Sequence, residues 1–386
     1  MTRIYLIRHA EAEGNLYRRI QGWYNGLITE NGFRQIEALT QRFREVPIDA
    51  VYSSDLARTM TTAAAVYKPK NLPLYTDVAL REIHMGWWED RPWAEIRRSD
   101  PEEYAQFSTA SPAWKVSGGE SLDEVRQRVG KALQKLARRH DGQTIAVFSH
   151  GSAIRSVLTW LEGRPVEDCV KRGHGDNTAV TLLEFHGEQA KIVFENDNTH
   201  LPREISTLHC QNWGENGPRT ADLWYRPLNF STEAALYTQA RQEAWVTVHG
   251  ALDGFEGEAY LQSARRLGQE DPGNVVCAML DDKVVGILEL DPEQDANQCV
   301  GIIPFYYMLP QYRYQNLGVQ LLGQAISTYR PLGRDVLRLR CARENTAAQH
   351  FYHKHGFQKT GEAPGVFGKL DVLEKYIGYG SVPRSF

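Results

Sequence analysis

The sequence has little that would place this protein outside the cell or in a membrane. It holds five cysteines among 386 residues, and none forms a C-x-x-C pair. A few widely spaced cysteines, odd in number, argue against a disulfide framework or a zinc site and favour a reducing compartment. Arg3 and Arg8 interrupt the apolar start, so it does not read as a signal peptide. The longest nearly apolar run, 299–310, is far shorter than the roughly 20 residues that span a bilayer. We therefore expect a cytoplasmic protein.

The sequence also lacks an excess of basic residues. Lys and Arg number 44 and Asp and Glu number 48, which gives a formal net charge of −4. That balance excludes the broad basic surface with which proteins bind nucleic acid or an anionic membrane, and we expect neither as a partner. Any affinity for phosphate must come from a few local arginines. Internal repeats and low-complexity tracts are absent as well, so the two halves of the chain are unrelated modules.

What is present suffices for two domains. The length exceeds the roughly 100–200 residues of one domain, and the fractions of hydrophobic and charged residues, 42% and 24%, are ordinary for globular proteins. Regular patterning fades between residues 196 and 227, where Asn, Gly and Pro are frequent. We predict one domain over 1–207, a linker over 208–221 and a second domain over 222–386.

Strands and helices alternate in the first half. Apolar periodicity predicts strands at 3–8, 50–54 and 144–149 and helices at 58–67 and 121–139. Ser121 and Glu124 have the spacing of a capping box at the start of the last helix. This alternation is typical of a parallel, layered α/β sheet.

Titratable side chains follow these predicted strands. Arg8 and His9 end the first strand, His150 ends the third, and Arg58 opens the helix after the second. Glu82 stands in a segment rich in apolar and aromatic residues. Because the carboxyl ends of strands in an open α/β sheet face the ligand, we expect the histidines and arginines to converge there.

These residue types suit attack on phosphorus. A neutral His9 can act as nucleophile and form a phosphohistidine, and Arg8 and Arg58 can bind the phosphoryl oxygens in bidentate fashion. The two cations also lower the pKa of His9 and keep it unprotonated. His150 can donate a further hydrogen bond. Apolar neighbours would favour the protonated form of Glu82, which makes it the candidate general acid. No metal is needed.

Six segments together resemble the histidine phosphatase superfamily, also called phosphoglycerate mutase-like. They are IYLIRHAEAEGN, QGWYNGLITENG, VYSSDLARTMTTA, REIHMGWWED, GGES and VFSHGSAIR. The resemblance covers about residues 1–205 and implies a three-layer α/β/α fold with His9 as nucleophile and Glu82 as proton donor. It implies a phosphate pocket formed by Arg8, Asn15, Arg58 and His150. Two positions depart from the family pattern, since Ala10 and Asp90 stand where glycine is common.

The segment after Glu82 bears on the choice between mutase and hydrolase. Mutases of the family carry a longer, basic insertion there, whereas this segment is short and holds only Arg91, Arg97 and Arg98. We therefore favour a hydrolase. Four tryptophans follow the acid, and the sequence leaves open whether they line a pocket for a bulky substrate or pack helices and loops: Trp87, Trp88, Trp93 and Trp114.

The second half has a different pattern. It predicts a strand within 223–230, helices at 233–249 and 258–267, a hairpin of 275–280 with 284–290, a helix from Gly318, a strand at 336–341 and a helix at 346–355. Pro304 within a further strand indicates a bulge. Backbone N–H groups at the start of the helix from Gly318 would suit an anion.

Two motifs of this half, YRYQNLG and ENTAAQHFYHKHGF, resemble the GNAT acetyltransferase superfamily over about residues 222–380. The resemblance implies an α+β fold that binds acetyl-CoA, with Asn345 on the pantetheine arm and Tyr352 as proton donor to the CoA thiolate. The residues implied to bind the rest of the cofactor are Leu309, Tyr314, Gln315, Asn316, Leu317, Gly318 and Val319. Tyr314 and Asn316 stand where the family usually has glycine. The base for the amine is either Glu289 or a chain of water molecules.

We therefore expect a bifunctional enzyme, a metal-independent phosphomonoesterase joined to an acetyl-CoA-dependent N-acetyltransferase. Its ligands would be a small-molecule phosphate ester and a small-molecule or peptide amine. Two alternatives stay open: a phosphoglycerate mutase with an appended module, and a phosphatase with a CoA-sensing domain that transfers nothing. Whether the chain forms a homodimer is also open.

Overall fold

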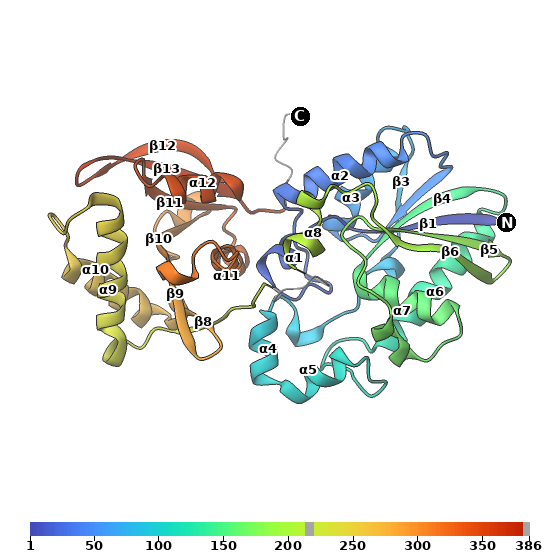
Figure 1. The fold of residues 1–386 in the computed structure, drawn as a ribbon, viewed down its shortest axis with the longest axis horizontal. Helices are drawn as coiled ribbons and strands as arrows, with labels where there is room; N and C mark the ends of the chain where they lie inside the picture. Colours follow the sequence, from blue (N-terminus) through green and yellow to red (C-terminus); the bar gives the residue numbers. More distant parts are fainter. Residues whose placement is uncertain (213–219, 381–386) are drawn as a thin grey trace. The chain divides into compact units, whose positions relative to one another are not determined.

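The computed structural model describes residues 1–212 and 220–380. The chain divides into two compact units, 1–219 and 220–386, each built around its own sheet (Figure 1). Part of the predicted linker, 208–221, lies outside the described residues, so the predicted domain limits stay a proposal. Within the described ranges, no helix is long and apolar enough to cross a membrane.

The first unit contains a six-stranded sheet in the order β3-β2-β4-β1-β5-β6. Its strands are β1 (Thr2–Arg8), β2 (Ala50–Ser53), β3 (Leu74–Thr76), β4 (Thr144–Ser149), β5 (Val180–His186) and β6 (Gln189–Asp197). The three predicted strands are confirmed as β1, β2 and β4, and these pair in parallel. The expected parallel sheet is wrong at one side, since β5 runs antiparallel to both β1 and β6. Only two residues separate β5 from β6, and so short a turn joins antiparallel strands alone.

Helices cover both faces of this sheet. The α-helices of the described part of this unit are α1 (Glu13–Tyr17), α2 (Glu30–Phe43), α3 (Ala57–Tyr67), α4 (Trp93–Ser99), α5 (Pro101–Ser108), α6 (Leu122–Arg139), α7 (Gly151–Leu161) and α8 (Thr207–Cys210). Alternate residues of β1 enter opposite cores: Leu6 joins the core of α6 and α7, and Ile7 joins that of α2 and α3. The predicted three layers follow from this alternation. The predicted capping box is confirmed, since Ser121 Oγ accepts from Glu124 N (3.2 Å) and Glu124 Oε2 accepts from Ser121 N (2.7 Å).

The second unit contains a mostly antiparallel sheet in the order β12-β13-β11-β10-β9-β8-β7. Its strands are β7 (Trp224–Pro227), β8 (Val275–Leu280), β9 (Lys283–Asp291), β10 (Val300–Met308), β11 (Val336–Ala342), β12 (Gln358–Gly365) and β13 (Gly368–Tyr376). Its helices are α9 (Phe230–His249), α10 (Gly257–Glu270), α11 (Gly318–Tyr329) and α12 (Thr346–Lys354). The strand expected within 223–230 ends early, because the Asn229 side chain accepts from Ser231 N and starts α9.

The two central strands of this sheet diverge. β10 pairs in parallel with β11 only from Val300 to Ile302, and then continues along β9 while β11 continues along β13. The register of β10 against β9 shifts between Ile302 and Phe305. Pro304 lies in that interval, which confirms the predicted bulge. The result is the α+β fold expected of the GNAT superfamily.

Candidate active sites

Five side chains meet at the carboxyl end of the parallel strands in the first unit. Arg8 and His9 follow β1, His150 follows β4 and caps α7, Arg58 lies in the first turn of α3, and Glu82 comes from the segment after β3. The rings of His9 and His150 lie 5.3 Å apart, and Arg58 Nε donates to His150 Nδ1 at 3.2 Å. The expected convergence is therefore present in the fold.

His9 is held in one tautomer. Its Nδ1 lies 2.7 Å from the carbonyl oxygen of Ala10. A carbonyl oxygen only accepts, so Nδ1 carries the proton and the lone pair remains on Nε2. Burial lowers the pKa of His9 well below its usual range, and the charges of Arg58 and Arg8 lower it further. The ring is thus a neutral imidazole with a nitrogen available for attack.

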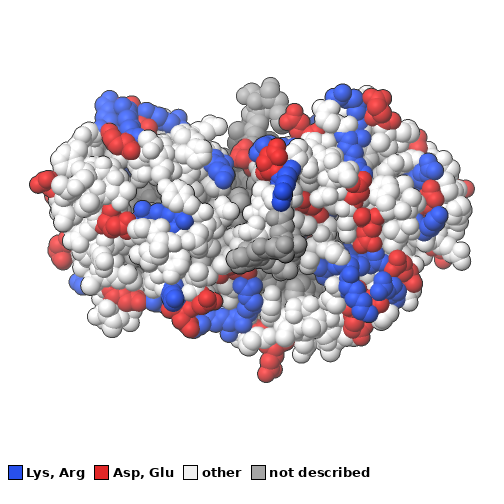
Figure 2. Space-filling model, in the orientation of Figure 1, with Lys and Arg blue, Asp and Glu red and all other residues white. Residues whose placement is uncertain are grey.

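Arg58 is fully buried and binds the loop before α2. It donates to the carbonyl oxygens of Tyr24 (2.9 Å) and Gly22 (2.6 Å) as well as to His150. Burial lowers the pKa of Arg58 to about 10, so it remains a cation near neutral pH. Figure 2 shows acidic and basic side chains mixed over the face it draws. Buried arginines such as Arg58 therefore provide a local positive charge that this surface view does not display.

Both ring nitrogens of His150 have protein partners. Nδ1 accepts from Arg58, so Nε2 carries the proton and donates to Ser54 Oγ at 2.9 Å. Burial lowers the pKa of His150 well below its usual range, and the charge of Arg58 lowers it further. The hydrogen bond that the sequence predicts from His150 to phosphate therefore requires the exchange of one of these two partners.

Arg8 has an unused donor. Its Nη1 donates to the carbonyl oxygen of Gly175 at 2.5 Å, whereas its buried Nε makes no hydrogen bond within the described residues. A Cβ on Gly151 would lie 3.3 Å from that Nε, so glycine at the start of α7 leaves room for the guanidinium. Burial lowers the pKa of Arg8, which the nearby Asp176 partly offsets.

Asn15, the remaining predicted phosphate ligand, reaches His9 through a second asparagine. Asn15 Oδ1 accepts from the side-chain amide of Asn177 at 3.3 Å, and the same amide donates to the carbonyl oxygen of His9 at 2.9 Å. Asn15 Oδ1 also accepts from Ala12 N at 3.0 Å. In the described part of the chain no hydrogen bond uses the side-chain nitrogen Nδ2 of Asn15, which leaves it as a donor.

The surroundings of Glu82 differ from the expected apolar ones. Its carboxylate accepts from three backbone N–H groups, those of Ile83 (3.0 Å), Ser152 (3.0 Å) and Ala153 (2.8 Å). The last two belong to the first turn of α7, so Glu82 caps that helix from 70 residues away in sequence. The apolar neighbours in the sequence, such as Met85, turn into the core instead.

In the second unit, the predicted cofactor turn keeps the backbone that glycine usually supplies. Tyr314 and Asn316 both adopt left-handed conformations, with φ of 61° and 57°, and the ring of Tyr314 is 92% exposed. The hydrogen bonds of the described residues include none donated by an N–H group from Tyr314 to Val319. Because α11 begins at Gly318, these groups gather at a helix N-terminus, which is a site for an anion.

The other predicted residues of this unit have identifiable partners. Asn345 caps α12, with Oδ1 accepting from Ala348 N at 3.2 Å. Tyr352 is buried, which raises its pKa, and its ring lies 5.9 Å from that of Tyr306. The carboxylate of Glu289 is buried and accepts at 2.6 Å from both Tyr237 and Arg241. Glu289 is therefore committed to an ion pair rather than available as the base for the amine.

Comparison with known proteins assigns the families. The model of histidine phosphatase superfamily branch 1 matches residues 4–198, about half of the chain. The chain belongs to the histidine phosphatase superfamily. The model of the GNAT acetyltransferase family matches residues 237–357, so this histidine phosphatase domain is followed by a GNAT acetyltransferase domain.

Individual relatives cover the first domain. Phosphoserine phosphatase 1 of Hydrogenobacter thermophilus is 30% identical over 201 residues, which are 52% of this chain and 95% of the relative. The probable phosphoglycerate mutase GpmB of Yersinia pestis is 34% identical over 165 residues, 43% of this chain and 77% of the relative. Among solved structures, Bacillus stearothermophilus YhfR has a TM-score of 0.50 at 32% identity and covers 52% of this chain and 99% of its own.

Three of the four tryptophans that follow Glu82 pack in the core of the histidine phosphatase domain. Trp88 and Trp114 are buried, and Trp93 packs against the same core. Trp88 and Trp114 also contact each other, with ring centroids 5.8 Å apart. Trp87 alone among the four is substantially exposed, at 41%. The sequence leaves open whether these tryptophans line a pocket or pack helices and loops. The structure shows packing for Trp88, Trp93 and Trp114.

The departure at Asp90 is accommodated. Asp90 has φ of 61°, the left-handed region that glycine would occupy, and its Oδ1 accepts from Arg19 Nε at 3.0 Å. An ion pair that bridges the chain from Arg19 to Asp90 thus accompanies this strained conformation. The loop beside Glu82 therefore keeps its backbone without glycine.

Sequence reasoning missed Glu89, whose carboxylate organises the loop that holds Arg58. It accepts from the backbone N–H groups of Gly22 (3.1 Å), Trp23 (2.7 Å) and Tyr24 (2.8 Å), and from Met85 N (2.9 Å). The carbonyl oxygens of the same loop accept from Arg58. The signal was present as the acid next to Asp90 in the segment WWED, but only the long-range contacts show its use.

A second missed residue is Arg155, one turn into α7. Its Nε is buried and makes no hydrogen bond within the described ranges, and its Nη1 contacts the ring of His174 at 2.9 Å. Burial lowers the pKa of Arg155, and Glu82 is among the charges that raise it. Arg155 thus adds a third guanidinium to those of Arg8 and Arg58, and its charge acts on both Arg8 and Glu82.

We expect Glu89→Gln to lower phosphatase kcat/KM roughly 10- to 100-fold, because an amide cannot accept from four N–H groups and the loss of a charged acceptor costs about 1.5–3 kcal/mol. The affinity for inorganic phosphate should fall in parallel, since Arg58 loses its support. Glu95→Gln is the matched control, because Glu95 lies nearby in the sequence and pairs with Arg91 at the surface. Equal activity of the two variants would show that the loop does not depend on Glu89.

Proposed function

We propose that the chain is a bifunctional enzyme, in which the first domain hydrolyses phosphomonoesters through a phosphohistidine at His9 and the second transfers acetyl groups from acetyl-CoA to an amine. The observation that carries the first activity is the geometry of His9. A neutral ring with its lone pair on Nε2 lies buried beside the guanidinium groups of Arg8 and Arg58. Fixed cations at a water-poor site match the charge of phosphoryl oxygens without reorganisation.

The proposed reaction has two steps. His9 Nε2 attacks phosphorus, the bond from phosphorus to the ester oxygen breaks, and Glu82 donates a proton to the leaving alkoxide. Water then attacks the phosphohistidine and transfers a proton to the Glu82 carboxylate, which restores the acid. This step releases inorganic phosphate and neutral His9. Arg8 and Arg58 bind the phosphoryl oxygens in both steps.

Hydrolysis rather than mutase activity is supported by the segment after Glu82. Its tryptophans are largely committed to the core, and its basic residues lie at the surface, where Arg91 pairs with Glu95 and Arg97 stacks on Tyr104. These contacts therefore place neither Arg91 nor Arg97 beside His9. The likeness to a probable phosphoglycerate mutase keeps mutase activity as the second candidate.

Product analysis separates the two candidates. The full chain is incubated with 3-phosphoglycerate, with and without a trace of 2,3-bisphosphoglycerate, and with a panel of other phosphomonoesters. We expect release of inorganic phosphate from members of the panel and no accumulation of 2-phosphoglycerate. Rapid formation of 2-phosphoglycerate without phosphate release would replace the hydrolase by a mutase.

For the second domain, we expect acetyl-CoA to stabilise the full chain. Ligand bound only to the folded state at 100 times its Kd adds about 2.7 kcal/mol, which raises the Tm of the GNAT unfolding transition by several degrees. Gly318→Glu should remove the shift, because it places a carboxylate against the pyrophosphate. Ser327→Glu, near the other end of α11, adds the same charge as a control and should keep it.

Acetyl transfer itself is tested with Tyr352→Phe. The variant lacks only the hydroxyl that we propose to protonate the CoA thiolate, so the shift with acetyl-CoA should persist while transfer to an amine falls. A shift without transfer in the wild-type chain would favour the alternative of a CoA-sensing domain. No shift in Tm at millimolar acetyl-CoA would show that the turn does not bind acetyl-CoA when Tyr314 and Asn316 stand in the places of glycine.

A further inference from the structure

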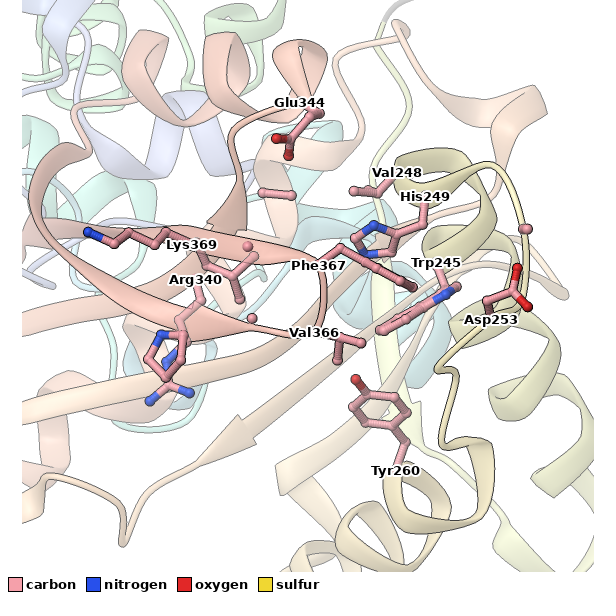
Figure 3. Close-up of a pocket in the computed structure, with 16 residues that line it drawn as sticks. Trp245, Val248, His249, Asp253, Tyr260, Arg340, Glu344, Val366, Phe367 and Lys369 are labelled. Atoms are coloured by element: carbon pink, nitrogen blue, oxygen red, sulfur yellow. The ribbon is translucent and has the colours of Figure 1, made fainter.

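A pocket of about 720 Å³ lies within the second unit, lined by α9 and the loop after it, α10, β11 and the β12–β13 turn (Figure 3). None of the residues proposed to hold acetyl-CoA lines it. Glu344 does, and it directly precedes Asn345, the proposed contact of the pantetheine arm. The volume is typical of small-molecule sites, which measure about 300–1,000 Å³. The pocket therefore adjoins the proposed cofactor arm without being part of the pyrophosphate site.

One wall of this pocket is aromatic. Trp245 and His249 of α9 lie 4.4 Å apart between ring centroids, and Phe367 from the β12–β13 turn lies 5.0 Å from His249 and 6.1 Å from Trp245. Phe367 and its neighbour Val366 are 59% and 61% exposed. Trp245 and His249 are half-buried, and rings clustered in a concave site favour a flat, apolar occupant.

Four charged side chains complete the pocket. Lys369 is already paired with Glu362 at 2.7 Å. Arg340, Asp253 and Glu344 make no ion pair or side-chain hydrogen bond within residues 220–380, the described part of this unit. In Figure 3 Arg340 lies to the left of the aromatic group, Asp253 to its right and Glu344 above it. The guanidinium of Arg340 and the carboxylate of Glu344, on two sides of the aromatic rings, complement a molecule that carries a carboxylate, an ammonium group and an aromatic ring.

We infer that this pocket binds the acceptor of the acetyl group and that the acceptor is an amino acid, or a small derivative of one, with an aromatic side chain. Arg340 binds its carboxylate, Glu344 its ammonium group beside the cofactor arm, and the wall of Trp245 and Phe367 its ring. The inference rests on the acetyl transfer proposed above. The ammonium loses one proton to solvent and the amine attacks the thioester carbonyl. The C–S bond breaks, Tyr352 donates its proton to the CoA thiolate, and the proton that the new amide nitrogen releases restores the Tyr352 hydroxyl.

Direct binding to the full chain tests the pocket independently of transfer. L-tryptophan, tryptamine, indole-3-propionate and L-alanine are titrated calorimetrically without acetyl-CoA, which measures acceptor binding. In a separate arm each compound is added with saturating acetyl-CoA, which measures turnover. We expect L-tryptophan to bind about tenfold more tightly than tryptamine or indole-3-propionate, since each of those lacks one charge-assisted contact. L-alanine, which lacks the ring, should bind more weakly still.

Two variants of exposed residues assign these preferences. Arg340→Gln should abolish the difference in affinity between L-tryptophan and tryptamine. Phe367→Ala should weaken the binding of all three indole compounds. Arg265→Gln, an exposed guanidinium on α10 outside the pocket, is the control and should change neither. Equal affinities for L-tryptophan and tryptamine in the wild-type chain, or a preference unchanged by Arg340→Gln, would overturn the inference. So would failure of every indole compound to bind a chain that binds acetyl-CoA, whereas failure to bind acetyl-CoA would instead overturn the proposed transfer.

Discussion

Replacing His9 with alanine is expected to lower phosphatase turnover at least about 10⁴-fold, because a nucleophile that forms a covalent intermediate has no substitute. The other imidazole of the site, His150, has both ring nitrogens bound, to Arg58 and to Ser54. The fold should persist, since within the described residues the His9 ring bonds only to the carbonyl oxygen of the next residue. Steady-state phosphate release and the Tm measure the two effects.

The control for this variant is His186→Ala, which removes an exposed histidine at the end of β5. It should leave phosphate release unchanged. If His9→Ala retained near wild-type activity with its Tm intact, the assignment of the nucleophile would be wrong.

The second large effect concerns Glu82→Gln. We expect hydrolysis of alkyl phosphates to slow by about 10²–10⁴-fold, which is the usual contribution of a general acid, while hydrolysis of p-nitrophenyl phosphate slows far less. The reason is that p-nitrophenolate leaves without a proton, whereas an alkoxide needs one. The comparison of kcat on the two substrates measures the effect within a single variant.

The structure makes this comparison necessary. Glu82 also accepts from the N–H groups of Ser152 and Ala153 at the start of α7, and a glutamine amide would place a donor against one of them. A shift of α7 would displace His150, the residue that caps this helix, and would affect both substrates alike. Equal losses on the two substrates would therefore show that Glu82 acts by position only.

The residues that act within one segment were predictable, and those that depend on distant segments were not. β1, β2 and β4 follow from short apolar runs, and the start of α6 follows from the spacing of Ser121 and Glu124. The antiparallel side of the first sheet did not follow, because the alternation of strands and helices gives no direction for β5 and β6. The left-handed backbone at Asn316 suits that residue type, whereas for Tyr314 only its place in the family pattern, where glycine is usual, indicates the same conformation.

The site shows the same limit. The positions of Arg8, His9 and His150 at strand ends, and of Arg58 at the start of a helix, predicted which side chains meet. Their hydrogen-bond partners could not be predicted, since Glu82 binds a helix 70 residues away. Glu89 likewise reaches a loop 65 to 67 residues earlier. Such contacts depend on how the layers pack, which local patterns do not encode.

The covalent intermediate is the most direct test of the account. The full chain is mixed with a phosphate ester labelled at phosphorus, quenched during turnover, digested and mapped. We predict label on the peptide that contains His9, labile to acid and stable to base as a phosphoramidate is, and absent from His9→Ala. Turnover without label at His9, or label on another residue in the wild-type chain, would contradict the account.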